Sequence, residues 1–308
     1  MPLNYDALLS TTLANYQKRL TDNIFQDRVL TWYLEDKAAT KLRGGTKIVE
    51  PLIYDDNSTF GSYSGYDTIS LTPQDGLSAA EFDWKQLAVS IAISGIEEAK
   101  NAGEEAVLDL LDAKVMQAEE TAKEGLNTML FGDGTGNSGK NFMGLAGIVE
   151  SGNTIGGIDS STYTWWRSYE ENTAGALTEA QMRTAYNTVS KGNDTPDMIL
   201  TTQTLFEKYE SLLTPQVRYS DVKMANLGFQ NLLFKGTPVA YDPACTAGVM
   251  YFLNSKYLRL VGHSSKWFTQ TEFVRPENMD ARYALILAYG NLTVRNRARL
   301  GKLTAKTA

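Results

Sequence analysis

Residues 126–148, LNTMLFGDGTGNSGKNFMGLAGI, decide the fold, because here an apolar helical pattern runs into a cluster of glycines. The cluster matches a dinucleotide-binding motif, since Gly134, Gly136 and Gly139 satisfy G-x-G-x-x-G. It also satisfies all of the phosphate-binding motif G-x-x-x-x-G-K-[ST] except its last position, with Lys140 as the lysine. The stretch therefore either holds a nucleotide or turns the chain at the end of a helix.

The order of helix and loop argues against a nucleotide site. Phosphate-binding glycine loops lead from a strand into the N-terminus of a helix, where free N–H groups face the phosphates. This loop instead follows a helix C-terminus, the negative end of the helix dipole. Asn141 also replaces the hydroxyl residue that would bind magnesium. We interpret the glycines as a helix stop, with Gly132 and Gly134 in left-handed backbone conformations, and expect no cofactor.

The helix that precedes this stop is predicted to span residues 97–131, a rod on the order of 50 Å long. One face carries apolar residues at spacings of mostly three and four, and the other faces are charged. The apolar stripe consists of Val107, Leu110, Leu111, Val115, Ala118, Ala122, Leu126 and Met129.

The chain before this helix reads as a helix over residues 3–35 and as an extended segment over residues 46–94. Within the extended segment, Phe82 and Trp84 alternate with one parity, whereas the apolar residues from Leu87 onward alternate with the other. Such a phase change predicts a bulge or strong twist within one long two-stranded ribbon.

The chain after the glycines alternates short helices with strands. Thr178 and Gln181 form a capping box for a helix that ends near Gly192, the expected C′ residue. A buried strand (PDMILTT) and a second amphipathic helix follow, then several strands over residues 234–268, and finally one or two long strands over residues 281–303. Helices and strands are partly segregated, so the fold class is α+β.

Composition narrows the function classes. The 308 residues carry a formal net charge of −7, which argues against a protein that coats nucleic acid. The single cysteine, Cys245, excludes an intrachain disulfide and a multi-cysteine zinc site. No apolar run approaches the roughly 18 residues of a membrane span or forms a signal peptide, so we expect no membrane contact.

No set of residues predicts catalysis or metal binding. His263 is the only histidine, and it lies in a probable strand end without a nucleophile elbow. The acidic pairs at 97–98 and 104–105 split between helix faces, because neighbouring helical residues point about 100° apart. Asp133 and Asn137 lack the clustered oxygens of a calcium site. We therefore expect no enzyme and no metal.

Arg295, Arg297 and Arg299 recur with period two, so a strand would place all three on one side. Three hypotheses remain, in order of preference: salt bridges to the chain's own carboxylates, contact with a neighbouring subunit, and contact with DNA. The Trp165-Trp166 pair is interpreted as a covered hydrophobic patch rather than a stacking platform.

The chain resembles the major capsid proteins of tailed bacteriophages, which have the Hong Kong ninety-seven type fold. The helix ending in LNTMLFGDGTG, with FMGLAGI after it, is similar to the family's spine helix and its exit. Residues 229–260 are similar to a recurring block in which a Gly-x-Pro-Val strand leads to a hairpin, and residues 279–303 resemble the return strand. The resemblance implies five parts: an N-terminal arm (1–40), an extended two-stranded loop (41–95), a peripheral domain with the spine helix (96–150), a central axial α/β domain (151–270) and return strands of the peripheral domain (271–308).

The resemblance implies a protein that self-assembles, through pentamers and hexamers, into an icosahedral shell around double-stranded DNA. Expected partners are other copies of the chain, a portal protein, the DNA and a decoration protein, with assembly in the host bacterial cytoplasm. No long N-terminal scaffolding segment is visible, so a separate scaffolding protein is expected. The alternatives are a tail-tube or other virion structural protein, and an unrecognised enzyme.

The extended segment 44–94 favours a structural role, because its large apolar residues are too sparse to bury themselves on their own chain. We expect it to lie across a neighbouring subunit. The predicted contacts between subunits involve the basic residues Lys41, Lys47 and Lys85, the acidic residues Glu104, Glu105, Glu119 and Glu120, and the three arginines Arg295, Arg297 and Arg299.

Overall fold

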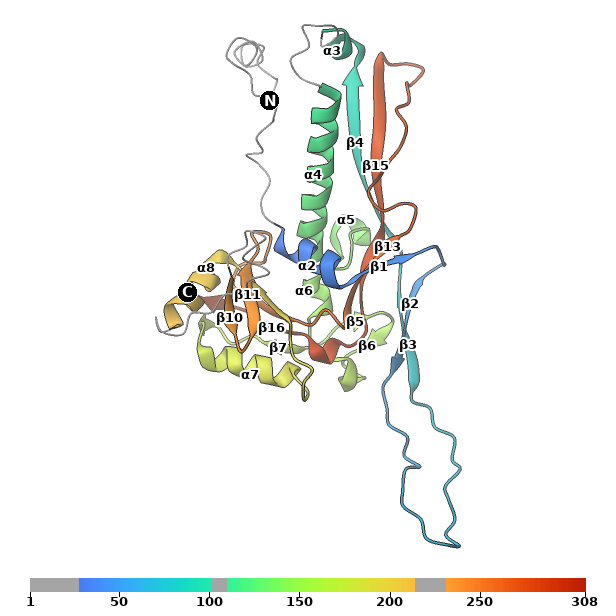
Figure 1. The fold of residues 1–308 in the computed structure, drawn as a ribbon, viewed down its shortest axis with the longest axis vertical. Coiled ribbons are helices and arrows are strands. Elements are labelled where there is room, and N and C mark those ends of the chain that lie inside the picture. Colours follow the sequence, from blue (N-terminus) through green and yellow to red (C-terminus); the bar gives the residue numbers. More distant parts are fainter. Residues whose placement is uncertain (1–27, 101–109, 214–230) are drawn as a thin grey trace.

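The computed structural model describes residues 28–100, 110–213 and 231–308. The molecule is elongated (Figure 1). A long helix and a pair of long strands extend toward one end, a two-stranded arm extends toward the other, and a smaller α/β layer lies to one side.

The long helix, α4 (Leu110–Phe131), lies against a five-stranded sheet. In that sheet β4 (Lys85–Ser94) pairs antiparallel with β15 (Ala281–Val294) over ten residues. The remaining strands are β1 (Ala39–Leu42), β13 (Leu258–His263) and β14 (Thr269–Gln270).

The predicted apolar stripe is the face of α4 that packs inward: Ala118, Ala122 and Leu126 are buried, and Val115 packs beside them. A short helix, α3 (Gly95–Lys100), precedes α4. The joining residues 101–109, with Glu104, Glu105 and Val107, lie outside the described part of the chain. The described parts of the helix expected over 97–131 are α3 and α4.

The arm consists of β2 (Ile48–Ile53), β3 (Leu77–Phe82) and the connecting residues 54–76. Among the described strands β2 and β3 pair only with each other, whereas β4 pairs with β15. The change of apolar parity between Phe82 and Leu87 thus marks a change of sheet between β3 and β4. The prediction of a bulge within one ribbon was wrong, because each sheet presents a different side of the chain to the core.

A six-stranded sheet forms the α/β layer, in the order β10-β11-β9-β12-β16-β7. Both faces of its central strands are buried, so β9 reads as a continuous apolar run. Helices α7 and α8 pack with Ile199 on one face, while Met198 and Leu200 join the main core on the other. The elements are β10 (Asn231–Phe234), β11 (Thr237–Tyr241), β9 (Met198–Thr201), β12 (Met250–Leu253), β16 (Gly301–Leu303), β7 (Tyr169–Glu171), α7 (Glu179–Val189) and α8 (Gln203–Leu212).

The capping box predicted for α7 is present. Thr178 Oγ1 accepts from the Gln181 N–H, and Gln181 Oε1 accepts from the Thr178 N–H. The expected C′ glycine is displaced, because the helix is capped at Ser190 and Gly192 lies two residues beyond it, at φ 60°. The long C-terminal pattern divides into β15 and β16, which belong to different sheets.

Short elements connect these layers. Helix α2 (Val29–Lys37) packs on α4 and is the described part of the helix expected over 3–35; residues 1–27 lie outside the described chain.

Among the described residues no helix is long and apolar enough to cross a membrane. The other elements are α5 (Gly136–Gly139), α6 (Leu145–Ile148), β5 (Thr154–Ile155), β6 (Ile158–Asp159), η1 (Thr164–Trp166), β8 (Gly175–Ala176), η2 (Arg297–Arg299) and β17 (Lys306–Thr307).

Candidate assembly surfaces

The glycine turn, residues 132–144, follows the C-terminus of α4, as predicted. Gly134 has a left-handed backbone at φ 81°, but Gly132 does not, so the prediction for Gly132 was wrong. The left-handed conformations continue instead at Asn137, Ser138 and Gly139. The turn lies at the C-terminus of α4, the negative end of that helix dipole, which disfavours a bound phosphate.

The turn is fastened to the core on both sides. Phe142 is completely buried, and the Met143 N–H donates to Asn291 Oδ1 of β15 at 2.8 Å. Lys85 Nζ of β4 donates to the Gly139 carbonyl. A Cβ on Gly144 would lie 2.4–2.7 Å from three backbone carbonyl oxygens at the end of α4, so only glycine fits there. The glycines serve the packing of the spine helix.

The root of the arm is fixed by a buried carboxylate. Glu50, in the middle of β2, has no exposed surface. Its oxygens accept from Arg259 Nη1 at 2.8 and 2.9 Å and from Arg295 Nε at 2.8 Å, and Thr293 Oγ1 donates at 3.1 Å. One anion thus holds two cations, Arg259 of β13 and Arg295 directly after β15, and this explains why a charge is buried there. The sequence analysis missed Glu50, although it is the only charged residue between Ile48 and Ile53.

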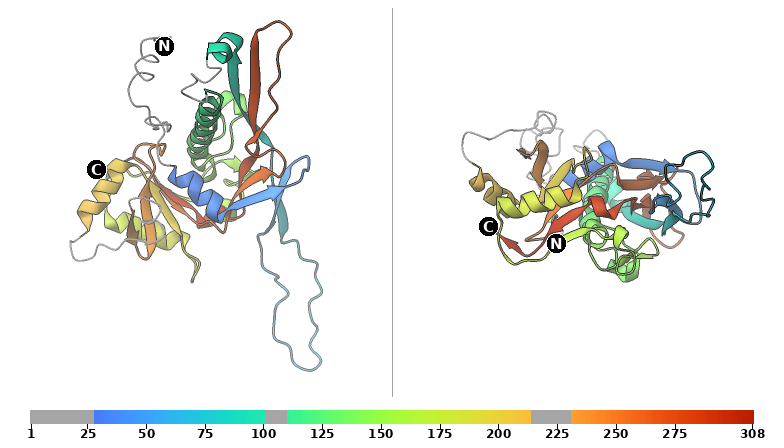
Figure 2. Two further views of the ribbon diagram at one scale, coloured as in Figure 1. Left: turned by 45° about the horizontal axis from the view of Figure 1, so that its top comes forward. Right: turned by 90° about the horizontal axis from the view of Figure 1, so that it is seen from below.

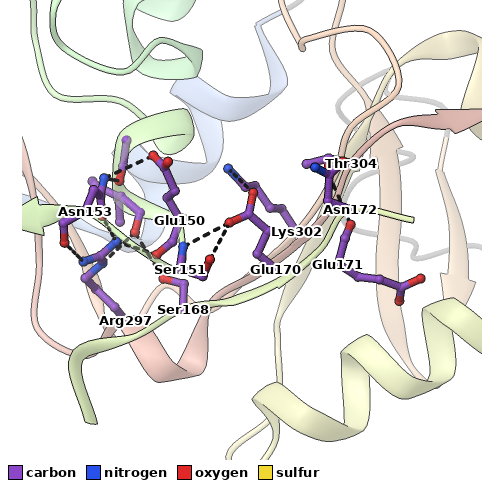
Figure 3. A network of polar contacts seen from close by, with 12 residues as sticks. Glu150, Ser151, Asn153, Ser168, Glu170, Glu171, Asn172, Arg297, Lys302 and Thr304 are labelled. Atoms are coloured by element: carbon purple, nitrogen blue, oxygen red, sulfur yellow. Dashed lines mark hydrogen bonds and ion pairs between the residues drawn. The ribbon is translucent and has the colours of Figure 1, made fainter. Parts of the chain in front are cut away.

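The three arginines do not share a face. Asn296 caps the short helix η2 by accepting from Ala298 N, and this helix ends the strand pattern. Arg295 pairs with Glu50. This is a salt bridge to a carboxylate of the same chain, the first of the three hypotheses. Arg297 is completely buried and donates to the Ile148 and Glu150 carbonyls at 2.8 and 2.7 Å and to Asn153 Oδ1 (Figure 3). The expectation of one arginine surface was therefore wrong.

Burial lowers the pKa of Arg297 to about 10, which leaves the guanidinium charged at neutral pH. Arg299 is half-buried and donates to the Val189 carbonyl. Arg297 accordingly acts inside its own subunit, as a clamp on residues 148–153.

Two lysines that the sequence analysis did not single out continue this clamp. Lys302 pairs with Glu170 at 3.1 Å (Figure 3). Lys306 pairs with Glu171 at 3.2 Å. Burial alone would raise the pKa of Glu170, but hydrogen bonds from Ser151 and the pairing with Lys302 outweigh it, so its pKa is lowered. The Lys302–Glu170 contact follows the parallel pairing of β16 with β7, a long-range pairing that no local pattern reveals.

Several residues predicted to contact a neighbour have partners within the subunit. Lys47 pairs with Glu81 at 2.7 Å, and Lys85 binds the glycine turn. Glu120 pairs with Arg28 at 2.6 Å and Lys123 at 3.0 Å, which fastens the start of α2 to the spine helix. In contrast, Lys41 and Glu119 are exposed, and neither forms an ion pair with another described residue.

The arm loop, residues 55–75, exposes an unusual number of large apolar side chains. Phe60, Tyr66 and Leu71 are 96%, 107% and 90% exposed. Tyr63 and Ile69 are also exposed. At the root of the arm, by comparison, Ile48 and Leu52 are buried in the subunit's own core, which the sequence analysis did not expect. Among the described residues the distal part of the arm therefore has the least cover from its own chain, although Val49, Ile53 and Leu77 of β2 and β3 are exposed as well.

The remaining candidates have structural positions. Trp166 is buried and its Nε1 donates to the Ile155 carbonyl, while Trp165 stacks on Tyr54 at the neck of the arm, at 5.2 Å between ring centroids. The tryptophan pair is therefore covered, as predicted. Burial raises the pKa of the Cys245 thiol, and His263 contacts Ser265 and the edge of the Trp84 ring. Within the described ranges no three His, Cys, Asp or Glu residues gather to hold a metal ion.

The comparison with protein families decides what these surfaces belong to. The model of the SU10 major capsid protein family matches residues 87–307, more than two thirds of the chain. The chain belongs to the SU10 major capsid protein family. A comparison with curated protein sequences found no significant match.

Solved structures agree with the family in fold. The capsid protein of cyanophage A-1(L) superposes with a TM-score of 0.73 at 18% identity, covering 96% of this chain and 98% of the other. The capsid protein of a native GTA particle gives a TM-score of 0.65 at 10% identity, with both chains fully covered. The SrpI encapsulin of Synechococcus elongatus gives 0.64 at 13% identity, covering 97% and 95%.

As a member of the SU10 major capsid protein family, the chain is a structural protein of the virion shell and not an enzyme. It associates with copies of itself in that shell. The α+β capsid fold expected from the resemblance is confirmed, and the tail-tube alternative is set aside.

Proposed function

We propose that the chain assembles through pentamers and hexamers into an icosahedral shell that encloses the double-stranded DNA of a tailed bacteriophage. A separate scaffolding protein directs assembly in the host cytoplasm, a portal protein occupies one vertex, and a decoration protein binds outside. Residues 96–150 and 271–308 form a peripheral domain, and residues 151–270 form an axial domain.

The exposed arm loop is the observation that supports this proposal most. Burying an apolar side chain of this size contributes roughly 1.5–3 kcal/mol. The five exposed apolar residues from Phe60 to Leu71 therefore contribute no burial energy to the isolated subunit. Cover from a neighbouring subunit turns the same surface into the main attraction between copies. Lys41 and Glu119, which pair with no other described residue, form ion pairs across that contact, each worth ~0–1 kcal/mol.

Co-expression with the cognate scaffold tests the proposal by electron microscopy. Closed particles or tubes built of five- and six-membered rings are the expected outcome. A chain that stays a compact monomer at every concentration and salt would refute it.

Hydrogen exchange tests the role of the arm in the same preparations. Amides of residues 55–75 should exchange fast in the free subunit and be strongly protected in particles, while the paired amides of β2 and β3 stay protected in both. Equal exchange of 55–75 in the two states would mean that the loop does not contact a neighbour.

A further inference from the structure

Strand β1 leaves one side of the five-stranded sheet open. The Leu260 N–H donates to the Ala38 carbonyl and the Ser264 N–H donates to the Leu42 carbonyl, so the even-numbered peptide groups face β13. The N–H and C=O groups of Ala39 and Lys41 consequently point away from the sheet. Among the described strands none pairs with that side. An open edge of this kind is a template for another strand.

The arm loop contains a segment with the pattern of a strand but no strand partner. Residues 68–72, TISLT, alternate polar residues with Ile69 and Leu71, and all of them except Ser70 and Leu71 are β-branched. The structure gives this segment no ladder, and Ile69 and Leu71 are 55% and 90% exposed. Five residues span about 17 Å and the four of β1 about 13 Å, so their lengths match.

The arm loop and the chain around β1 carry opposite charges. The arm loop carries Asp55, Asp56, Asp67 and Asp75 and no basic residue. The chain from Ala38 to Lys47, which contains β1, carries only basic charges, and its Lys41 and Arg43 are exposed. Opposite charges attract across a contact and fix its register, whereas two arm loops would repel each other.

The faces of the two segments also match. Leu42 is half-buried and packs with Trp84 against the core, and Trp84 contacts His263, the register partner of Leu42. A strand added beside β1 with Ile69 and Leu71 on this face would extend the apolar surface, and its Thr68, Ser70 and Thr72 would lie on the exposed face with Lys41.

From these observations we infer that residues 68–72 of one copy add as a strand to the open edge of β1 in a neighbouring copy. The occupant is a second copy because the arm loop extends away from its own β1, both in Figure 1 and in the left view of Figure 2. The inference rests on the proposed shell function and names the site that receives the arm.

Disulfide crosslinking in assembled particles tests the inference. In a Cys245→Ala background, Lys41→Cys is combined in turn with a cysteine at each position from Thr68 to Thr72. One of the cysteines at Thr68, Ser70 and Thr72, the one opposite Lys41, should give at least tenfold more oligomeric ladder on denaturing gels than those at Ile69 or Leu71, because only alternate residues share a face with Lys41. An intrachain bond would give no ladder.

The outcomes separate this inference from the proposed function. Particles that show no crosslinking, or equal crosslinking at all five positions, overturn the strand addition and leave the shell function standing. A wild-type chain that forms no particles overturns the shell function itself. If the cysteine variants do not assemble, Lys41→Pro removes the outward N–H of an edge strand and should lower particle yield at least tenfold relative to Lys41→Ala. Equal yields would contradict strand addition.

Discussion

The arm loop and the glycine turn are both irregular and contain glycine, yet the turn is fastened to the rest of the subunit whereas the arm loop is not. The turn is held by Phe142, by the Met143–Asn291 bond and by Lys85. The side-chain hydrogen bonds of the arm loop stay within the arm, such as Ser58 to Gln74. The difference shows that composition alone does not separate a loop that holds the subunit together from one that is free to bind a neighbour.

Removing the arm loop should separate assembly from folding most clearly. Deleting residues 56–74 should abolish particles while leaving the thermal unfolding of the subunit nearly unchanged. The ends of the deleted segment are already close, because Tyr54 N donates to the Gly76 carbonyl at 3.0 Å. A shorter loop also costs slightly less closure entropy. Calorimetry measures the thermal unfolding of the variant, and electron microscopy measures its particle formation. Normal particles from the deletion variant would show that assembly does not depend on the arm loop.

The root of the arm should behave as part of the body. Glu50→Ala leaves Arg259 and Arg295 without their common anion, so the free energy of unfolding should fall by about 3–5 kcal/mol. Glu81→Ala is the matched control on the same ribbon, because it removes an exposed pair worth ~0–1 kcal/mol. Urea unfolding compares the two variants. Similar losses for both would show that the buried carboxylate does not fix the arm.

The glycine turn should respond to added volume according to position. Gly144→Ala places a methyl group against three carbonyl oxygens and should cost about 1–3 kcal/mol. Gly134→Ala, at φ 81°, should cost about 1–2 kcal/mol. Lys140→Ala should change stability by less than ~0.5 kcal/mol, and calorimetry should detect no ATP binding by either form. A nucleotide affinity lost with Lys140 would overturn the helix-stop interpretation.

Local patterns predicted the parts of this fold that local forces determine. The stripe from Ala118 to Leu126, the capping box at Thr178 and the burial of Trp166 follow from residues close in sequence. The failures concern long-range pairing. The period of two in the arginines suggested a strand, but the Asn296 cap starts a short helix there. The partner of Lys302 is Glu170, which lies on a strand more than a hundred residues away in sequence.

The change of apolar parity near Trp84 had the same physical origin. A sequence shows that the buried face changes, but it does not show whether one strand twists or the chain enters another sheet. The open edge of β1 and the unpaired segment 68–72 were likewise invisible, because an edge is defined by strands that are absent from it.

The smallest expected effect lies in the exposed part of the glycine turn. The Asp133 carboxylate accepts from the Thr135 N–H at 2.9 Å and from its hydroxyl at 2.8 Å, and these bonds lower the pKa of Asp133. Because the folded-state pKa is the lower one, the contribution to stability is present above the ordinary pKa of 3.8 and is lost as pH falls through the folded value. Asp133→Asn should therefore cost at most ~0.5 kcal/mol at pH 7 and nothing at pH 2. Urea unfolding at the two pH values measures the stability difference, and a carboxyl NMR titration measures the pKa of Asp133. A pKa at or above the ordinary value would mean that Asp133 does not hold the turn. The glycine turn would then be fastened only through its buried flanking residues.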